Sequence, residues 1–419
     1  MKKIIFLLML TSITYSQGLV FDEAGYNKTK SWEPSEKFGF SSTLPSKVSY
    51  RNYTPEVLSQ GKTATCVGYA VGYAQLSTQQ NIKMGITNPV HKIFRAMDPN
   101  FLYGFLSLQN QNDQWCQQGT SMNAAMEILY KRGSKPMLWY PWLKCNSSQT
   151  FSEFTLALAS NYTIDDYYRI PKEKTFVNDV KLALYNKLIV SAGINLTESF
   201  ETGATVKYGN WTPKYDEKII GGHAMCVIGY DDNRNGGSFE VMNSWGPDFG
   251  DNGYIWIKYS DFNFLVSQVY IINVKGISAG RCSMGDCKDS YSRYQFDNGD
   301  IYEGVVKNGK IDVFGSIIYN NDDFYVGTFQ NGRRHGYGLY YSSKNGAYYK
   351  VTYSQDVLID SSSVQGIANA KENSEKIDIV LSKIQEQLPG KIIKEGSDEF
   401  EKFSQSQEVP ELPMTIKLK

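Results

Sequence analysis

The sequence is poor in histidine and has no excess of either charge. Only three of its 419 residues are histidines, and 43 Lys and Arg are balanced by 43 Asp and Glu. A balanced charge gives no reason to expect binding to nucleic acid or to an anionic membrane surface. After the N-terminus, no apolar run approaches the roughly 20 residues that a transmembrane helix needs. The chain is therefore expected to be globular, and its length predicts more than one domain.

Cysteine is also scarce, with six residues in the chain. Cys226 lies in the apolar run 224–228 and is expected to be a buried, unreactive thiol. Cys282 and Cys287 are close enough in sequence for a disulfide that closes a short loop and stabilises the fold only modestly. A metal site at the same pair would need two more ligands, and none is evident nearby. We therefore expect no metal and no other cofactor.

The first 16 residues have the layout of a secretory signal peptide. Lys2 and Lys3 precede an apolar run at 4–10, and cleavage is expected after Ser16. The alternative is an N-terminal strand of the core. A signal peptide predicts a protein that is secreted, periplasmic or held at the cell surface.

The main domain is expected at 45–275, after a loose polar arm at 17–44. Its first half has helical patterns and its second half has strand patterns, which predicts the α+β class. Helices are expected at 66–80, 98–106 and 121–131, and strands at 188–192, 223–230, 239–243 and 253–259.

A second pattern begins near Tyr294. The segment 301–304 (IYEG) recurs as 324–327 (FYVG), and the dipeptide Asn-Gly recurs at the same offset of 23 residues. Asn-Gly favours tight β-hairpin turns, so we expect stacked hairpins at 291–352. The segment 325–338 closely resembles a MORN repeat, and this resemblance implies contact with a surface or scaffold. Residues 353–419 are expected to form a polar tail with one amphipathic helix near 377–388.

Three short segments contain the residue types that a thiol-based acyl transfer needs. They are 60–66 (QGKTATC), 221–224 (GGHA) and 243–246 (NSWG). A cysteine hydrolase requires a thiolate, a base, a group that orients the base, and donors for the oxyanion.

Each of these roles has a candidate residue. Cys66 begins the first expected helix, where the helix dipole lowers a thiol pKa. His223 is the candidate base and acid, and Asn243 on the next strand is the candidate group that orients it. Gln60 is the candidate oxyanion donor. Each residue taken alone is more often structural, but their joint occurrence on these elements favours a catalytic site.

These motifs resemble those of the papain-like cysteine peptidases over about 45–275. The resemblance implies a fold with a helical lobe followed by a β-rich lobe, and it assigns the four roles as above. It further implies that Gln118, Gly119, Gly222 and Trp245 line the substrate site, with Trp245 covering the contact between the asparagine and the histidine.

The sequence departs from the family at several positions. Val67 replaces the usual tryptophan after the nucleophile, and Thr63 replaces a structural cysteine. The family would pair Cys116 with that missing cysteine, so we expect Cys116 to pair with Cys145; two free thiols are the alternative. The long inhibitory propeptide is also missing. For the arm at 17–44 an ordinary surface tail is favoured over a cover across the cleft.

The sequence thus predicts an exported cysteine endopeptidase that hydrolyses peptide bonds through a thioester, with protein or peptide substrates. One alternative is a catalytically silent binding or scaffold protein with the same fold. Another is an amidase or transglutaminase-like acyl transferase. Deletion of 291–419 is expected to leave the cleavage of small peptides largely intact, unless the repeats pack as an integral part of the main domain.

Overall fold

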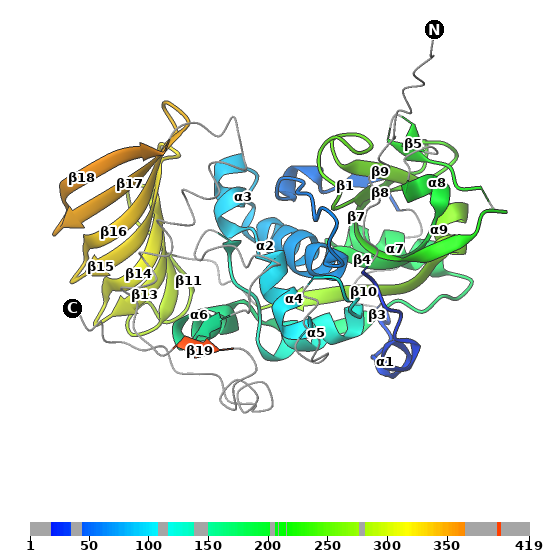
Figure 1. The fold of residues 1–419 in the computed structure, drawn as a ribbon, viewed down its shortest axis with the longest axis horizontal. Helices are drawn as coiled ribbons and strands as arrows, with labels where there is room; N and C mark the ends of the chain where they lie inside the picture. Colours follow the sequence, from blue (N-terminus) through cyan, green and yellow to red (C-terminus); the bar gives the residue numbers. More distant parts are fainter. Residues whose placement is uncertain are drawn as a thin grey trace, which may run out of the picture.

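A lobe of helices lies in the middle of the molecule, between two β-structures (Figure 1). The computed structural model describes residues 18–34, 44–107, 116–137, 150–201, 206–207, 209–214, 216–275, 281–364 and 392–394. The β-rich lobe packs on one side of the helices, and the repeat sheet lies on the other side. The expected architecture is confirmed: an α+β domain with a helical and a β-rich lobe, followed by a module of β-hairpins.

The helical lobe is built around the helix that begins at Cys66. Its residues Gly68–Leu76 (η3) have a π-helical winding, and α2 (Ser77–Met84) continues it. A β-carbon on Gly68 would lie 2.2 Å from the carbonyl oxygen of Pro99, so a small residue is needed where this helix meets α4 (Pro99–Ser107). The other elements of this part are η2 (Arg51–Tyr53), α3 (Pro89–Arg95), α5 (Met122–Lys131), α6 (Glu153–Ala159) and η5 (Ser160–Tyr162).

The β-rich lobe is one twisted sheet with three central strands, β4 (Val190–Thr197), β7 (Ile219–Asp231) and β8 (Ser238–Met242), which pair antiparallel in that order. The turn between β7 and β8 contains positive φ angles at 235–237, which confirms the expected hairpin. The remaining strands are β1 (Lys47–Ser49), β3 (Ile164–Arg169), β5 (Val206–Lys207), β6 (Asn210–Trp211), β9 (Tyr254–Lys258) and β10 (Val266–Val274). The helices of this lobe are α7 (Phe176–Tyr185), α8 (Glu198–Glu201) and α9 (Tyr259–Leu265).

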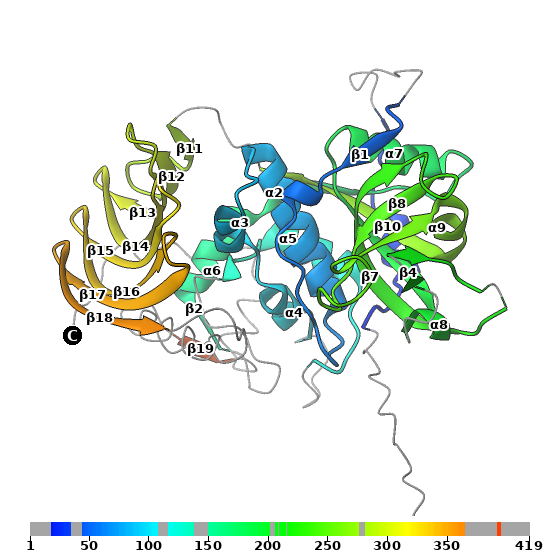
Figure 2. The ribbon, with the colours of Figure 1, turned by 90° about the horizontal axis from the view of Figure 1, so that it is seen from above.

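The repeat module is an antiparallel sheet whose strands pair in sequence order and curve together (Figure 2). Tyr302 and Tyr325, at equivalent positions of the two copies, pack closely against glycines of the next strand. A β-carbon on Gly315 would lie 2.6 Å from the Tyr302 ring, and one on Gly338 would lie 2.2 Å from the Tyr325 ring. Each 23-residue period therefore adds one hairpin with the same aromatic contact.

This sheet is longer than the sequence predicted. It extends from 282 to 364 rather than over 291–352, because residues 357–364 form an edge strand that was assigned to the polar tail. Its strands are β11 (Cys282–Met284), β12 (Tyr291–Gln295), β13 (Ile301–Lys307), β14 (Lys310–Ile318), β15 (Phe324–Gln330), β16 (Arg333–Ser342), β17 (Ala347–Ser354) and β18 (Val357–Val364). A separate pair of short strands joins β2 (Thr150–Ser152) to β19 (Ile392–Lys394).

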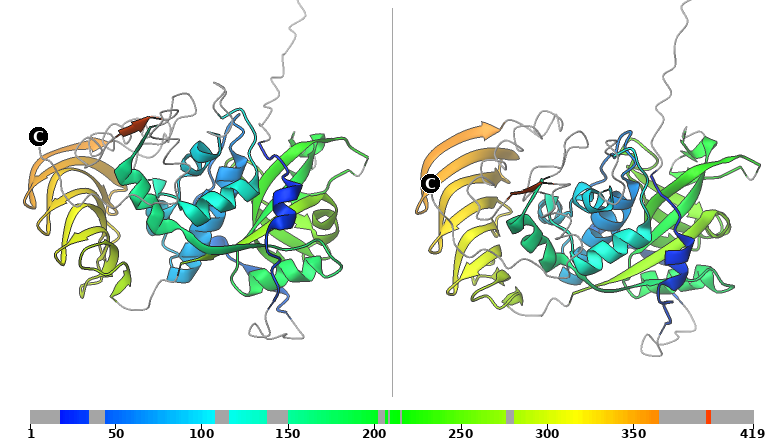
Figure 3. Two further views of the ribbon diagram at one scale, coloured as in Figure 1. Left: turned by 90° about the horizontal axis from the view of Figure 1, so that it is seen from below. Right: turned by 60° about the horizontal axis from the view of Figure 1, so that its bottom comes forward.

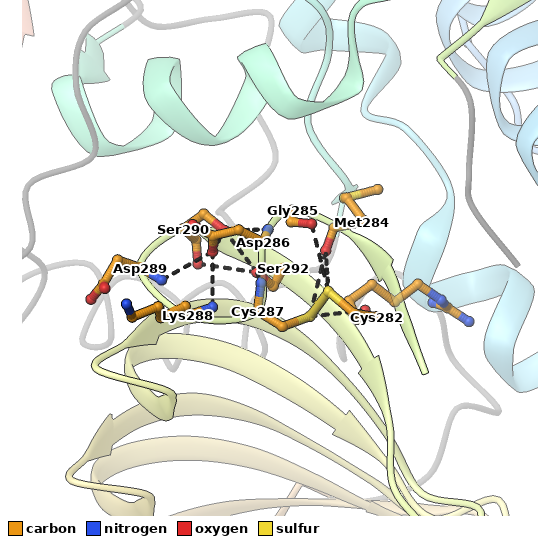
Figure 4. Close-up of a disulfide and its surroundings, with 10 residues drawn as sticks. Cys282, Met284, Gly285, Asp286, Cys287, Lys288, Asp289, Ser290 and Ser292 are labelled. Atoms are coloured by element: carbon orange, nitrogen blue, oxygen red, sulfur yellow. Dashed lines mark hydrogen bonds between the residues drawn. A yellow bond between two sulfur atoms is a disulfide. The ribbon is translucent and has the colours of Figure 1, made fainter. Parts of the chain in front are cut away.

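Disulfides occur at two of the expected positions. Cys282 and Cys287 are joined at the start of the repeat sheet, in a loop held by hydrogen bonds around Asp286 (Figure 4). Cys116 is also disulfide-bonded, whereas Cys145, its expected partner, lies outside the described residues. Cys226 is a free and buried thiol, as expected.

A buried ionic cluster joins the repeat sheet to the helical lobe, and the two lie close together in both views of Figure 3. The Glu303 carboxylate on β13 pairs with Arg95 of α3 and, at 2.8 Å, with Arg293 of β12. The hydroxyl of Tyr162 from η5 donates to the same carboxylate. These four side chains are all buried. The repeats therefore contact the helical lobe through buried charged groups, and the expected effect of deleting 291–419 stays a prediction.

The N-terminal arm is ordered where the structure describes it, in contrast to the loose leader that was expected. Asp22 caps α1 (Glu23–Lys28) by accepting a hydrogen bond from the backbone N–H of Gly25 at 2.8 Å. The expected signal peptide at 1–16 and the expected amphipathic helix at 377–388 lie outside the described residues. Among the helices that are described, none is long and apolar enough to span a membrane.

Candidate active site

Cys66 is the first residue of its helix, and its thiol is enclosed. The backbone of the preceding turn is fixed, because the Ala64 N–H donates to the Cys116 carbonyl oxygen at 2.6 Å. Burial raises the pKa of the Cys66 thiol to about 11, although backbone N–H groups of Ala224 and Gly18 face the sulfur and act in the opposite direction. The sulfur therefore lies beside the residue that follows His223, and beside the N-terminal arm.

His223 and Asn243 are brought together by the hairpin of β7 and β8. Their side chains meet through Nε2 of the imidazole and Oδ1 of the amide, 2.8 Å apart. Because an amide oxygen only accepts, Nε2 carries the hydrogen and Nδ1 is left as an acceptor. Nδ1 is buried and has no hydrogen-bond partner among the described residues. This tautomer leaves Nδ1 as the ring nitrogen that can take a proton.

The enclosed imidazole makes the fold sensitive to acid. Burial lowers the pKa of His223 from 6.5 to about 4, with the Asn243 hydrogen bond acting in the opposite direction. Below pH 6.5 the unfolded chain binds a proton that the folded chain binds only near pH 4, so stability falls across this window, by up to about 3 kcal/mol. Urea unfolding at several pH values should show this loss. His223→Gln should lose less stability over the same range, and equal losses in both proteins would contradict the assignment.

Gln60 is held in the site by the segment that follows Asn243. The Gln60 N–H donates to the Ser244 carbonyl oxygen at 2.8 Å, and the Ser244 hydroxyl donates to Gln60 Oε1 at 2.6 Å. Gln60 Nε2 donates to the Thr63 carbonyl oxygen at 2.7 Å, inside the turn that leads to Cys66. The side-chain amide is therefore oriented from both of its ends.

Trp245 packs against the ring of His223. Its ring centroid lies 5.0 Å from that of His223. Trp245 is itself buried and packs on Phe249 and Phe200, with centroids 4.9 Å and 5.1 Å away.

Gly119 and Gly222, two of the expected substrate-site residues, lie against the N-terminal arm. A β-carbon on Gly119 would lie 2.9 Å from the Gly18 carbonyl oxygen, and one on Gly222 would lie 2.8 Å from the Leu19 carbonyl oxygen. The backbone oxygen of Gln118 accepts a hydrogen bond from the Tyr103 hydroxyl at 2.8 Å. The sequence favoured a surface tail for this arm, and that interpretation was wrong for residues 18–20.

The structure brings together the residues that the sequence selected and adds two that it missed. Ser244 orients Gln60, and its place directly after Asn243 was the available signal. Thr120, whose backbone pairs with the arm, carried no signal, because a backbone contact leaves no mark on residue type. Within the described residues, no group of three or more His, Cys, Asp and Glu side chains could hold a metal ion.

Two protein-family models match the chain. The model of the papain family cysteine proteases matches residues 106–272, and the MORN repeat model matches 302–324 and 325–347. The first match contains His223 and Asn243 and begins after Gln60 and Cys66. The sequence motif at 60–66 therefore adds information that the family match does not contain.

Individual relatives cover different shares of the chain. An uncharacterized peptidase C1-like protein of Acanthamoeba polyphaga mimivirus is 28% identical over 230 residues, which is 52% of this chain and 70% of that protein. Pro-cathepsin H of Mus musculus is 30% identical over 152 residues, which is 35% of this chain and 42% of that protein.

Solved structures extend the likeness to the fold. Xylellain, a cysteine protease from Xylella fastidiosa, superposes with a TM-score of 0.51 at 21% identity, over 63% of this chain and 97% of that one. Residues 106–272 thus match the papain family of cysteine proteases, which supports a hydrolase, and two MORN repeats follow at 302–324 and 325–347.

Proposed function

We propose that this protein is an exported endopeptidase in which Cys66, His223, Asn243 and Gln60 hydrolyse peptide bonds through a thioester. The observation that carries the proposal is the buried hydrogen bond between His223 and Asn243. It occupies Nε2 of His223, so Nδ1 is the ring nitrogen that can accept the proton of the Cys66 thiol. Export is supported by disulfide bonding at Cys116 and at the start of the repeat sheet, because disulfides persist in oxidising compartments.

The reaction divides into two steps that share one base. His223 Nδ1 takes the proton of Cys66 as the sulfur attacks the peptide carbonyl, and the imidazolium returns that proton to the departing amine. The carbonyl oxygen becomes an oxyanion, which the Cys66 backbone N–H and the amide of Gln60 stabilise. Water, deprotonated by His223, then attacks the thioester and releases the acid and the thiol.

Asn243 is proposed to act by position. Its oxygen holds Nε2–H, so the ring keeps the tautomer in which Nδ1 is free, and it stabilises the imidazolium that forms during acylation. Trp245 is proposed to keep water from this hydrogen bond.

Covalent labelling tests the nucleophile. A peptidyl epoxide or vinyl sulfone should modify wild type at Cys66 and should leave Cys66→Ser unmodified. Cys226→Ser is the matched control, because Cys226 is the other free thiol among the described residues and is equally buried. It should be labelled like wild type. Equal labelling of wild type and Cys66→Ser would overturn the assignment and leave the silent scaffold as the better account.

Product analysis separates hydrolysis from transfer. With a peptide substrate and an added amine, an endopeptidase should yield mainly the free acid, whereas an acyl transferase would yield the new amide in proportion to the amine. A dominant amide product would contradict the hydrolytic proposal and favour the transferase.

A further inference from the structure

Residues 18–20 of the arm run between β7 and the segment at Thr120, and their backbone pairs with both. The Leu19 N–H donates to the Gly222 carbonyl oxygen at 3.2 Å. On the other side, the Val20 N–H donates to the Thr120 carbonyl oxygen at 2.9 Å, and the Thr120 N–H donates to the Gly18 carbonyl oxygen at 2.7 Å. These backbone bonds use donors and acceptors that an extended peptide bound in the same place would need.

The side chains of the arm alternate between the protein and the solvent. Leu19 is only 7% exposed, whereas Val20 is 53% exposed. A β-carbon on Gly193 would lie 2.8 Å from Leu19 Cδ2 and 2.9 Å from Met122 Cε, so Leu19 fits against a wall that only glycine leaves open. Leu19 therefore contributes most of the apolar burial of this strand, and Val20 contributes little.

Gly18 brings the arm directly to the nucleophile. A β-carbon on Gly18 would lie 2.0 Å from the Ala64 carbonyl oxygen, so no larger residue fits there, and its backbone N–H faces the Cys66 sulfur. Cys66 and His223 have no exposed surface in this arrangement. A substrate carbonyl cannot reach Cys66 while residues 18–20 stay in place.

The rest of the arm is fixed to the β-rich lobe independently of residues 18–20. The Tyr26 hydroxyl donates to the Ile170 carbonyl oxygen at 2.6 Å, and the Trp32 N–H donates to the Arg169 carbonyl oxygen at 2.8 Å. Tyr26 and Trp32 are both buried. Figure 1 shows α1 against the outside of the lobe, away from the repeats. Exposing Cys66 thus requires movement of residues 18–21 only.

We propose that residues 18–21 are a reversible cover that peptide substrates displace, while residues 22–32 keep it attached to the enzyme. A tethered segment returns to its place at a high effective concentration, so the cover closes again after each turnover and acts as a built-in competitor. The anchors make removal by cleavage unnecessary. That the cover competes with substrate rests on the proposed peptidase function. That movement of the cover exposes Cys66 does not depend on that function.

Alkylation of Cys66 measures the opening without requiring catalysis. In Leu19→Asp, a charge replaces the buried leucine, and the rate of iodoacetamide modification at Cys66, located by mass spectrometry, should rise about 10- to 100-fold. Val20→Asp introduces the same charge at the exposed neighbouring position and should react within about twofold of wild type. Leu19→Ala should give an intermediate rate, and thermal melting identifies any variant that is misfolded.

Peptide turnover and N-terminal mass analysis complete the test. Leu19→Asp should lower KM for a small peptide, and wild-type molecules that turn over substrate should keep residues 18–21. Unchanged Cys66 modification in both Leu19 variants would overturn the cover. Activity that arises only after loss of the arm would overturn its reversibility. Faster modification without turnover in any variant would support the cover and contradict the peptidase function instead.

Discussion

Replacing His223 with alanine should lower kcat/KM for a peptide substrate by about 10,000-fold or more. The thiol of Cys66 would lose both the base that takes its proton and the acid that protonates the leaving amine. No other histidine can substitute among the described residues: His91 lies on α3, where Nε2 is 3.3 Å from Asp322, and His335 lies on β16. Kinetics should be measured both with the native arm and with Leu19→Asp.

The control for this variant is His335→Ala, which removes an imidazole from the repeat sheet and should leave kcat/KM within about twofold. The kcat/KM of Asn243→Ala should lie between those of His223→Ala and His335→Ala, because the imidazole of His223 remains but loses the hydrogen bond that orients it. A loss of less than tenfold for His223→Ala would rule out His223 as the base.

The pH dependence of Cys66 alkylation gives an independent check. With the cover in place, burial raises the pKa of Cys66 to about 11, so reactivity should rise steeply only in alkaline solution. In Leu19→Asp the imidazolium of His223 can stabilise the thiolate, and reactivity should appear near neutral pH. Adding His223→Ala to this variant should return the profile to that of an ordinary thiol, near pH 8.5.

The residues of the candidate site could be selected from the sequence because they fall in short motifs. Gln60 and Cys66 belong to one turn, and Asn243 to Gly246 form one strand end, so their motifs are visible in the sequence. The hairpin of β7 and β8, which brings His223 to Asn243, was also predictable, because apolar runs flank a turn rich in Asn and Gly.

The position of the arm was not predictable for a physical reason. Leu19 is a single apolar residue between Gly18 and Val20, and it has no periodicity from which burial could be inferred. Its burial depends on Gly193 and Met122, which are distant in sequence. The π-helical winding of Gly68–Leu76 was missed similarly: the apolar pattern located the helix but did not define its hydrogen-bond spacing.

In the repeat module, too, local features were predictable and contacts between distant residues were not. Its hairpins follow from local Tyr-x-Gly and Asn-Gly patterns, whereas its attachment depends on Arg95 and Glu303, 208 residues apart. Strand β18 was assigned to the tail because the sequence from Val357 is polar. These residues form a strand because they pair with β17, and their own sequence does not indicate a strand.

Replacing Glu303 with glutamine should destabilise the protein by about 3–5 kcal/mol. The carboxylate is the counter-charge of two buried guanidinium groups, Arg95 and Arg293. Burial raises the pKa of Glu303, but these two cations outweigh that effect and hold the pKa below its ordinary value. Glutamine keeps the shape but leaves both cations without a buried anion. Urea unfolding of the full chain measures the loss.

Arg95→Met is the matched control. It also removes one charge from the cluster, but it leaves no buried charge without a counter-charge. Nε and Nη2 of Arg95 are buried without a partner among the described residues, so the arginine carries a desolvation cost of its own. Its removal leaves Glu303 and Arg293 as a one-to-one pair at 2.8 Å. Arg95→Met should therefore change stability by only about 1 kcal/mol.

The contrast between these variants decides how the repeats support the enzyme. If Glu303→Gln is strongly destabilised and Arg95→Met is not, the cluster is an integral part of the fold, and a chain truncated after residue 275 should lose soluble expression together with activity. If Glu303→Gln unfolds like wild type, the repeats are held by apolar contacts alone, and the truncated chain should retain peptide cleavage. In either case kcat per folded molecule should not change in Glu303→Gln, because the cluster lies outside the site that contains Cys66 and His223.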